Sequence, residues 1–144
     1  MNLNLKEKFN PWNDIAEMHD KFDTDCAVNA MDNVNLQSFV DFRMNLLEEE
    51  YEETWEAAES KDAEEFVDGL IDLVVVAIGT LDLLGVDVAK AWGRVMDANM
   101  SKEVGIKPSR PNPMGLPDLV KPAGWRGPSH LNNHGYLPEI WKEK

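Results

Sequence analysis

Two glutamates occupy positions where an amphipathic helix is expected to be apolar. Between residues 36 and 57, apolar side chains recur at spacings of three and four, the period of one helix face: Leu36, Phe39, Val40, Leu46, Leu47 and Ala57. At about 100° per residue, Glu50 and Glu53 fall within about 40° of Leu46, on that same face. Ionised carboxylates held against a core are costly unless a cation or strong donors compensate them. The spacing therefore predicts a bound cation.

A second acidic surface is expected on the helix that follows. Glu65, Asp68 and Asp72 lie within about 60° of one another on a helix surface. From Leu70 onward this helix is apolar almost all round, which predicts a central helix buried by neighbours on both sides, with Asp72 embedded. A short turn near residues 60–61 would pair the two helices antiparallel and bring their carboxylates to a similar level.

Oxygen ligands without thiol or imidazole suit hard cations, so the expected ion is Mg²⁺, with Mn²⁺ as a substitute. The predicted ligands are the four carboxylates Glu50, Glu53, Asp68 and Asp72. An alternative is a buried salt bridge, since Arg43 stands on the same stripe. Glu49 lies at the rim of the stripe, where a ligand, a base beside the ion and an exposed side chain are all consistent with its position.

Helices at four places are expected to position these side chains: residues 14–22, 35–60, 62–84 and 87–102. Asn13 is a candidate cap for the first. Residues 24–35 show no sustained period and indicate a loop. Asp62 favours the positive end of the third helix dipole, and Gly85 ends that helix.

The character of the chain changes beyond Gly105, because seven of the eight prolines lie from Pro108 onward. This tail still carries apolar residues such as Trp125 and Trp141, so we expect it to pack on the bundle or on a neighbouring subunit. No alternating pattern of useful length predicts strands. The fold class is therefore all-α, a four-helix-bundle-like subunit with a Pro/Gly-rich tail. The expected domains are residues 1–104, with a core at 14–102, and the irregular tail 105–144.

Composition excludes several classes of protein. The net charge is −13, from 27 acidic and 14 basic residues, and no basic cluster is visible, so nucleic acid and anionic membranes are not expected partners. The longest apolar run, residues 73–79, is far shorter than the roughly 20 residues that cross a bilayer. Charged residues 6–8 exclude a secretory signal. The lone Cys26 forms no internal disulfide and is a poor nucleophile. We expect a cytoplasmic location, the host cytoplasm if the protein is phage-encoded.

At these carboxylates the chain resembles the all-α nucleoside triphosphate pyrophosphatases, the MazG-like group that includes phosphoribosyl-ATP pyrophosphatase and the dimeric dUTPases. The resemblance covers residues 14–102. The family pattern EExxE matches Glu49, Glu50 and Glu53. The pattern ExxD matches only in part, because Gly69 stands three residues before Asp72, where the family has Glu. The neighbouring Asp68 resembles a DxLxD variant of phage-type and phosphoribosyl-ATP pyrophosphatase-like members and would supply the carboxylate.

Other segments strengthen the resemblance. They are RMNLLEEE from Arg43, DLVVVAIGTLDLLGV from Asp72, and NMSK at residues 99–102, the most diagnostic of the three. In such enzymes an Asn and a Lys after the fourth helix approach the nucleotide, which implies substrate binding by Asn99 and Lys102. The tail sequence DLVKPAGWRGP at residues 118–128 is similar to phage-type members, without an assigned chemistry.

The resemblance implies an activity and an assembly. Family members combine helices from two subunits and, with Mg²⁺, hydrolyse nucleoside triphosphates between the α and β phosphates, so a homodimer or homotetramer is expected. The metal would bind phosphate oxygens and orient a water, and the catalytic group would be Glu49, Glu50 and Glu53. Lys102 and Arg43 would neutralise the remaining phosphate charge. The preferred base and sugar stay open.

Two other classes of protein also place acidic residues on helices. A di-iron bundle needs Glu-x-x-His pairs, which His19, His130 and His134 do not provide. A non-catalytic acidic helical protein, binding a protein partner or mimicking DNA, explains the net charge but not the carboxylates on the apolar stripe.

Overall fold

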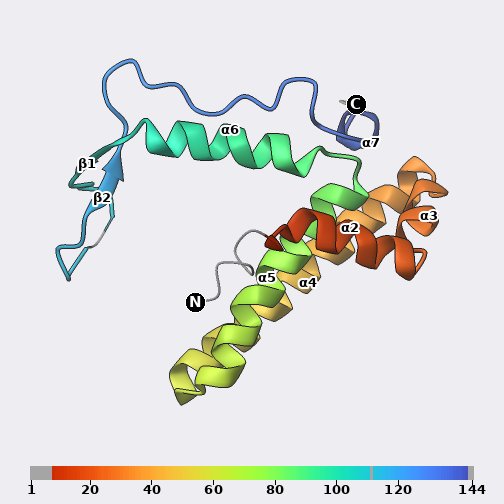
Figure 1. The fold of residues 1–144 in the computed structure, drawn as a ribbon, viewed down its shortest axis with the longest axis horizontal. Coiled ribbons are helices and arrows are strands. Elements are labelled where there is room, and N and C mark those ends of the chain that lie inside the picture. Colours follow the sequence, from red (N-terminus) through yellow and green to blue (C-terminus); the bar gives the residue numbers. More distant parts are fainter. Residues whose placement is uncertain (1–7, 111, 143–144) are drawn as a thin grey trace. The chain divides into compact units, whose positions relative to one another are not determined.

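The chain is mostly helical, which confirms the all-α class (Figure 1). The computed structural model describes residues 8–110 and 112–142. These residues form two compact units. The first comprises the chain up to Val88 and again from His134, and the second comprises Ala89–Asn133. The domain boundary expected at residue 104 stays a prediction.

A long antiparallel helix hairpin dominates the first unit (Figure 1). Its helices are α4, Asn33–Ser60, and α5, Ala63–Leu83. Each begins at an aspartate whose side chain accepts a backbone N–H three residues on: Asp32 from Asn35 at 2.8 Å, and Asp62 from Glu65 at 3.1 Å. Lys61 turns the chain between them in the left-handed conformation, with φ of 59°. The two central helices and their turn are therefore as predicted.

Two shorter helices precede the hairpin, and one of them was not expected. Helix α2, Pro11–Lys21, is capped by Asn10, which accepts the N–H of Asn13 at 3.1 Å, so Asn13 is not the cap. Helix α3, Thr24–Asn29, lies where a loop was expected. Its six residues are too few to show a helical period, and Val28 holds the segment in the core with only 2% of its surface exposed.

The core of the first unit lies at the end of the hairpin that α2 and α3 cover. One cluster joins α2 to α5 through Ile15, Ile78 and Val88, and another joins α3, α4 and α5 through Val28, Leu36 and Leu83. The last part of the chain returns to this end. Helix α7, Leu137–Ile140, follows Tyr136, whose N–H donates to the Leu84 carbonyl at 2.8 Å.

The rest of the hairpin leaves large apolar side chains exposed. On α4 these include Met44, Tyr51 and Trp55, and on α5 Val67, Leu70, Ile71 and Val74, each at least 45% exposed. The expectation that neighbours bury α5 on both sides is therefore wrong for this part of the helix in the single chain. Its apolar sequence specifies burial, but here α4 covers only one side of it, whereas α2 and α3 also pack against its other end.

The second unit is built around α6, Val88–Met100. Two three-residue strands follow it, β1, Glu103–Gly105, and β2, Asp118–Val120, paired antiparallel with Glu103 opposite Val120. No strands were expected, because segments this short carry no readable alternation. The chain then runs back along α6, to which Trp125 is hydrogen bonded (Figure 1). Across the part of the chain that the structure describes, no helix has the length and apolarity needed to span a membrane.

Candidate active site

Glu50 is the carboxylate that the hairpin partly encloses. It lies on the buried stripe of α4, one turn before Thr54, and is half-buried, while Glu49 and Glu53 are exposed. Desolvation raises the pKa of Glu50 above its usual value, and the charges of Asp72, Glu53, Asp68 and Glu49 raise it further. The expected packing against the core is therefore correct for Glu50 and wrong for Glu53 in the single chain.

Helix α5 contributes the acids that act on Glu50. Asp72 is half-buried and Asp68 is exposed. Both lie close enough to Glu50 to shift its pKa, and the Asp72 charge has the larger effect. The sequence thus correctly predicted that the hairpin turn brings acids of the two helices to a similar level. We call Glu49, Glu50, Glu53, Asp68 and Asp72 the hairpin carboxylates.

Gly69 shows why the family's glutamate is absent here. It is buried where α5 crosses α4, and a Cβ added to it would collide with the Thr54 side chain, 3.1 Å from its Cβ and closer still to its hydroxyl. A glutamate at this position cannot fit while Thr54 occupies the crossing. Asp68, one residue earlier and exposed, is the carboxylate that remains available at this level of α5.

The hairpin carboxylates suit a hard cation by their chemistry. All five offer oxygen, and their mutual repulsion at Glu50 is the charge imbalance that a divalent ion would relieve. Within residues 8–110 and 112–142, however, no three His, Cys, Asp or Glu side chains converge closely enough to hold an ion. Metal ligation by Glu50, Glu53, Asp68 and Asp72 stays a prediction.

The Arg43 side chain, on α4, is hydrogen bonded to α5. Its Nε donates to Thr80 Oγ1 at 2.9 Å and its Nη2 to the Val76 carbonyl at 3.0 Å, both on α5. Burial lowers the pKa of the guanidinium. No ion pair joins Arg43 to Glu50 or Glu53 in the described structure, so the salt-bridge alternative is not realised. Its contact with phosphate stays a prediction, and the observed contacts are structural.

Two further residues, His19 and Cys26, have no part in the carboxylate group. His19 is 4% exposed and its Nδ1 lies 2.7 Å from Asp82 Oδ2, so it links α2 to α5. Cys26 is a free, exposed thiol. The charge of Asp25, with smaller contributions from burial and Asp23, raises the pKa of Cys26, which makes it a poor nucleophile at neutral pH.

Asn99 and Lys102 belong to the second unit and are joined to each other. Lys102 Nζ donates to Asn99 Oδ1 at 3.0 Å and lies 5.1 Å from the centre of the Trp125 ring. Both residues are half-buried. Asn99 lies in the last turn of α6 and Lys102 lies just beyond its end, because the helix ends two residues short of the boundary that the sequence predicted. Their binding of a nucleotide stays a prediction.

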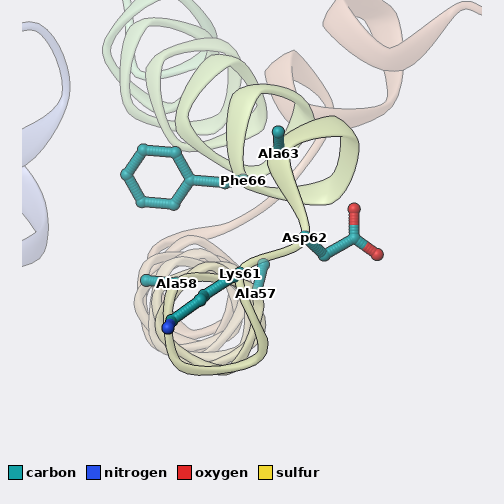
Figure 2. Close-up of a pocket in the computed structure, with 6 residues that line it drawn as sticks. All are labelled: Ala57, Ala58, Lys61, Asp62, Ala63 and Phe66. Atoms are coloured by element: carbon teal, nitrogen blue, oxygen red, sulfur yellow. The ribbon is translucent and has the colours of Figure 1, made fainter.

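Two shallow pockets lie at the tip of the hairpin. The first has an apolar floor of alanines with Phe66 on one side and the Asp62 carboxylate pointing to the other (Figure 2). No predicted site residue lines it. The second is acidic and includes Glu53 together with Glu56, Asp62 and Glu65. Glu65, part of the expected acidic ridge, therefore shares a pocket with one hairpin carboxylate.

A third pocket, in the second unit, contains residues absent from the predicted site. Arg94 and Arg126 line it with serine hydroxyls. Residues 89–133 also hold seven Lys and Arg but three Asp and Glu, a local excess of basic residues that the sequence analysis did not identify. A count over this segment alone would have revealed the excess, which the acidity of the whole chain conceals.

Comparison with known proteins supports one family. Neither the curated proteins nor the solved structures gave a match. The family model for phosphoribosyl-ATP pyrophosphohydrolase matches residues 17–99, more than half of the chain, and this segment holds every hairpin carboxylate together with Asn99. Such a match supports a pyrophosphohydrolase that acts on nucleotides. The chain belongs to the phosphoribosyl-ATP pyrophosphohydrolase family, within the MazG-like all-α nucleoside triphosphate pyrophosphatase superfamily.

Proposed function

We propose that this protein hydrolyses a nucleoside or deoxynucleoside triphosphate, or a related nucleotide such as phosphoribosyl-ATP, between the α and β phosphates in the presence of Mg²⁺. The products are a monophosphate and pyrophosphate. The observation that carries the proposal is the electrostatic grouping of the hairpin carboxylates around Glu50, inside the segment that the family model matches.

Four carboxylates, Glu50, Glu53, Asp68 and Asp72, are the proposed holders of the ion. When bound, Mg²⁺ supplies positive charge against phosphate oxygens and lowers the pKa of a coordinated water. Glu49 and Glu53 are exposed, so their carboxylates are free to reach a water and accept its proton. Glu50 is held on the stripe by the backbone of α4, where Thr54 Oγ1 donates to the Glu50 carbonyl at 2.6 Å. Asn99 and Lys102 are proposed to bind the substrate.

A homodimer or homotetramer is the proposed assembly. Met44, Tyr51 and Trp55 lie on one face of α4, and the exposed residues Val67, Leu70, Ile71 and Val74 lie on one face of α5. Contiguous apolar surface of this kind is characteristic of protein interfaces. A second copy has the same stripes to offer, and isologous contact would bury both. Light scattering at micromolar concentration should give a mass of two or four chains, and a monomer would contradict the proposal. A cytoplasmic location remains a proposal that rests on the single free cysteine.

Product analysis tests the chemistry directly. The full chain is incubated with each common NTP and dNTP and with phosphoribosyl-ATP, with Mg²⁺ or with EDTA. We expect pyrophosphate and the monophosphate from at least one substrate, and only with the metal. Release of orthophosphate alone would show cleavage at another bond, and equal rates in EDTA would exclude a metal-dependent site.

A further inference from the structure

The two units differ in the sign of their charge. Residues 89–133 carry a net charge of +4, while the remainder of the chain carries −17, which together make the −13 of the protein. Of the three acids in the second unit, Asp118 pairs with Arg110 at 3.6 Å. Arg94 and Arg126 have no carboxylate partner in the described part of the chain. An arginine without a carboxylate partner keeps its charge and its forked donors available to an anion.

These arginines meet in one pocket, formed by the end of α6 and by the segment that follows β2. Its lining is Arg94, Asp97, Ala98, Ser101, Arg126, Gly127, Pro128 and Ser129. Four of these residues come from α6 and its last turn. Three others, Arg126, Gly127 and Pro128, end the tail motif KPAGWRGP, for which the sequence suggested no chemistry. The motif therefore completes a cationic pocket.

The central residues of the motif fix its loop against α6. Gly124 has φ of +77°, which permits the tight turn closed by the hydrogen bond from Trp125 N–H to the Pro122 carbonyl at 3.0 Å. The Trp125 indole N–H then donates to the Ala98 carbonyl at 3.1 Å and to Ser101 Oγ at 2.9 Å. Ser101 Oγ also donates to Ala98 O at 2.7 Å. The carbonyl dipole at the helix end, which repels anions, is thereby capped.

Several donors in the pocket are left for a ligand. Arg94 uses one nitrogen, Nη1, in a long 3.4 Å contact with the Leu131 carbonyl, and Arg126 makes no hydrogen bond within the described residues. Ser129 Oγ accepts the Leu131 N–H at 3.3 Å, which leaves its own hydrogen free to donate. Asp97 is the one acid in the lining, so two guanidinium charges face a single carboxylate. Forked guanidinium donors match phosphate oxygens.

We propose that the pocket of Arg94, Arg126 and Ser129 binds a diphosphate group without a metal ion, with Asp97 limiting its affinity. The identity of the anion rests on the proposed function, because that reaction consumes a polyphosphate ester and releases pyrophosphate. Both possible ligands, the nucleotide and the released pyrophosphate, contain a diphosphate group.

Calorimetric titrations in EDTA test the proposal on the full chain, with pyrophosphate, ATP and AMP as probes. We expect pyrophosphate and ATP to bind and AMP to bind weakly. Tighter binding of ATP would indicate that the pocket holds the nucleotide, and tighter binding of pyrophosphate that it holds the released product. Arg126→Gln should weaken binding about tenfold or more. Arg94→Gln should do the same, and Asp97→Asn should tighten it severalfold. Lys107→Gln is the matched control, because it removes one positive charge from the same unit outside the pocket.

Three results would overturn the proposal: no binding of either diphosphate, unchanged affinity in Arg126→Gln, or an equal loss in Lys107→Gln, which would indicate diffuse charge. Arg126→Gln breaks no hydrogen bond in the described structure, so it keeps the test valid if Arg94→Gln disturbs the fold. Glu53→Gln separates this proposal from the proposed function. This variant should lose turnover and still bind pyrophosphate in EDTA. If the protein has no pyrophosphohydrolase activity at all, the arginine variants should still weaken the binding of pyrophosphate, so the two proposals can fail separately.

Discussion

The two units of this protein place opposite charges on different kinds of scaffold. In the first, long regular helices hold carboxylates around Glu50, and desolvation, followed by the charges of those neighbouring carboxylates, raises its pKa. In the second, an irregular loop is tied to α6 by Trp125 and presents arginines. Screening in salt limits the reach of a charge to about 10 Å, so the charges close to a group matter more than the total. A net charge for the whole chain therefore says little about either region.

The largest expected effect tests whether the chemistry belongs to the acidic unit. Glu53→Gln and Asp72→Asn should each reduce pyrophosphate release by about 10²-fold or more, because each removes a proposed ion ligand and, at Glu53, a proton acceptor. Glu53 is exposed, so circular dichroism should show intact helices. Glu52→Gln makes the same charge change at an exposed neighbouring position and should leave turnover unchanged.

Full activity in both variants would contradict the assignment of the chemistry to the acidic unit. Those carboxylates would then lie outside the site, and the acidic hairpin would be only a charged surface.

A smaller effect is expected at Gly69, where α5 crosses α4 beside Thr54. Gly69→Ala should destabilise the protein by about 1–3 kcal/mol, because its Cβ would collide with Thr54. The helix propensity of alanine, worth about 1 kcal/mol, offsets only part of this. Urea unfolding measures the change. In a Thr54→Ala background the penalty should shrink, since the nearest colliding atom, the Thr54 hydroxyl, is gone. An equal penalty in both backgrounds would show that the crossing is not close.

The smallest effect concerns the balance of charge at Glu50. Because its pKa is raised in the folded state, its contribution to stability is fully present below the unfolded pKa and is lost as pH rises through the folded value, above the ordinary 4.5. Glu50→Gln should therefore stabilise the metal-free protein at pH 7, by less than about 1 kcal/mol given its partial exposure, and have little effect near pH 4. Thermal unfolding at the two pH values measures this.

The same variant sharpens the metal proposal. Mg²⁺ at 100 times its Kd should stabilise the wild type by about 2.7 kcal/mol at pH 7 and Glu50→Gln by less. Glu48→Gln, at an exposed position on α4, is the control and should respond like the wild type. Stabilisation of Glu50→Gln equal to that of the wild type would exclude Glu50 as a ligand.

The sequence predicted the parts of the fold that have a local signal, namely a periodic apolar pattern or a residue that starts or ends a helix. The helical period, the start of the third helix near Asp62 and the turn near residues 60–61 are local signals, and the structure confirms them. The six residues of α3 and the two three-residue strands carry no periodic signal of their own, and contacts with distant segments hold them. For the site, the grouping of acids on two helices was predictable because it follows from helix geometry and a short turn.

Composition and spacing alone determined that this chain is helical and that it sets carboxylates from two neighbouring helices near one another. Its motifs added a resemblance to the nucleotide pyrophosphohydrolases, and the family model confirms that resemblance. Tertiary structure decided which contacts individual side chains make. Arg43 lies against α5 instead of pairing with a glutamate, and Gly69 lies at a helix crossing where no larger side chain fits. It also joined Arg94 to Arg126 in one pocket. A helix period fixes directions around one axis, but distances between elements are set by packing, which involves residues far apart in the chain.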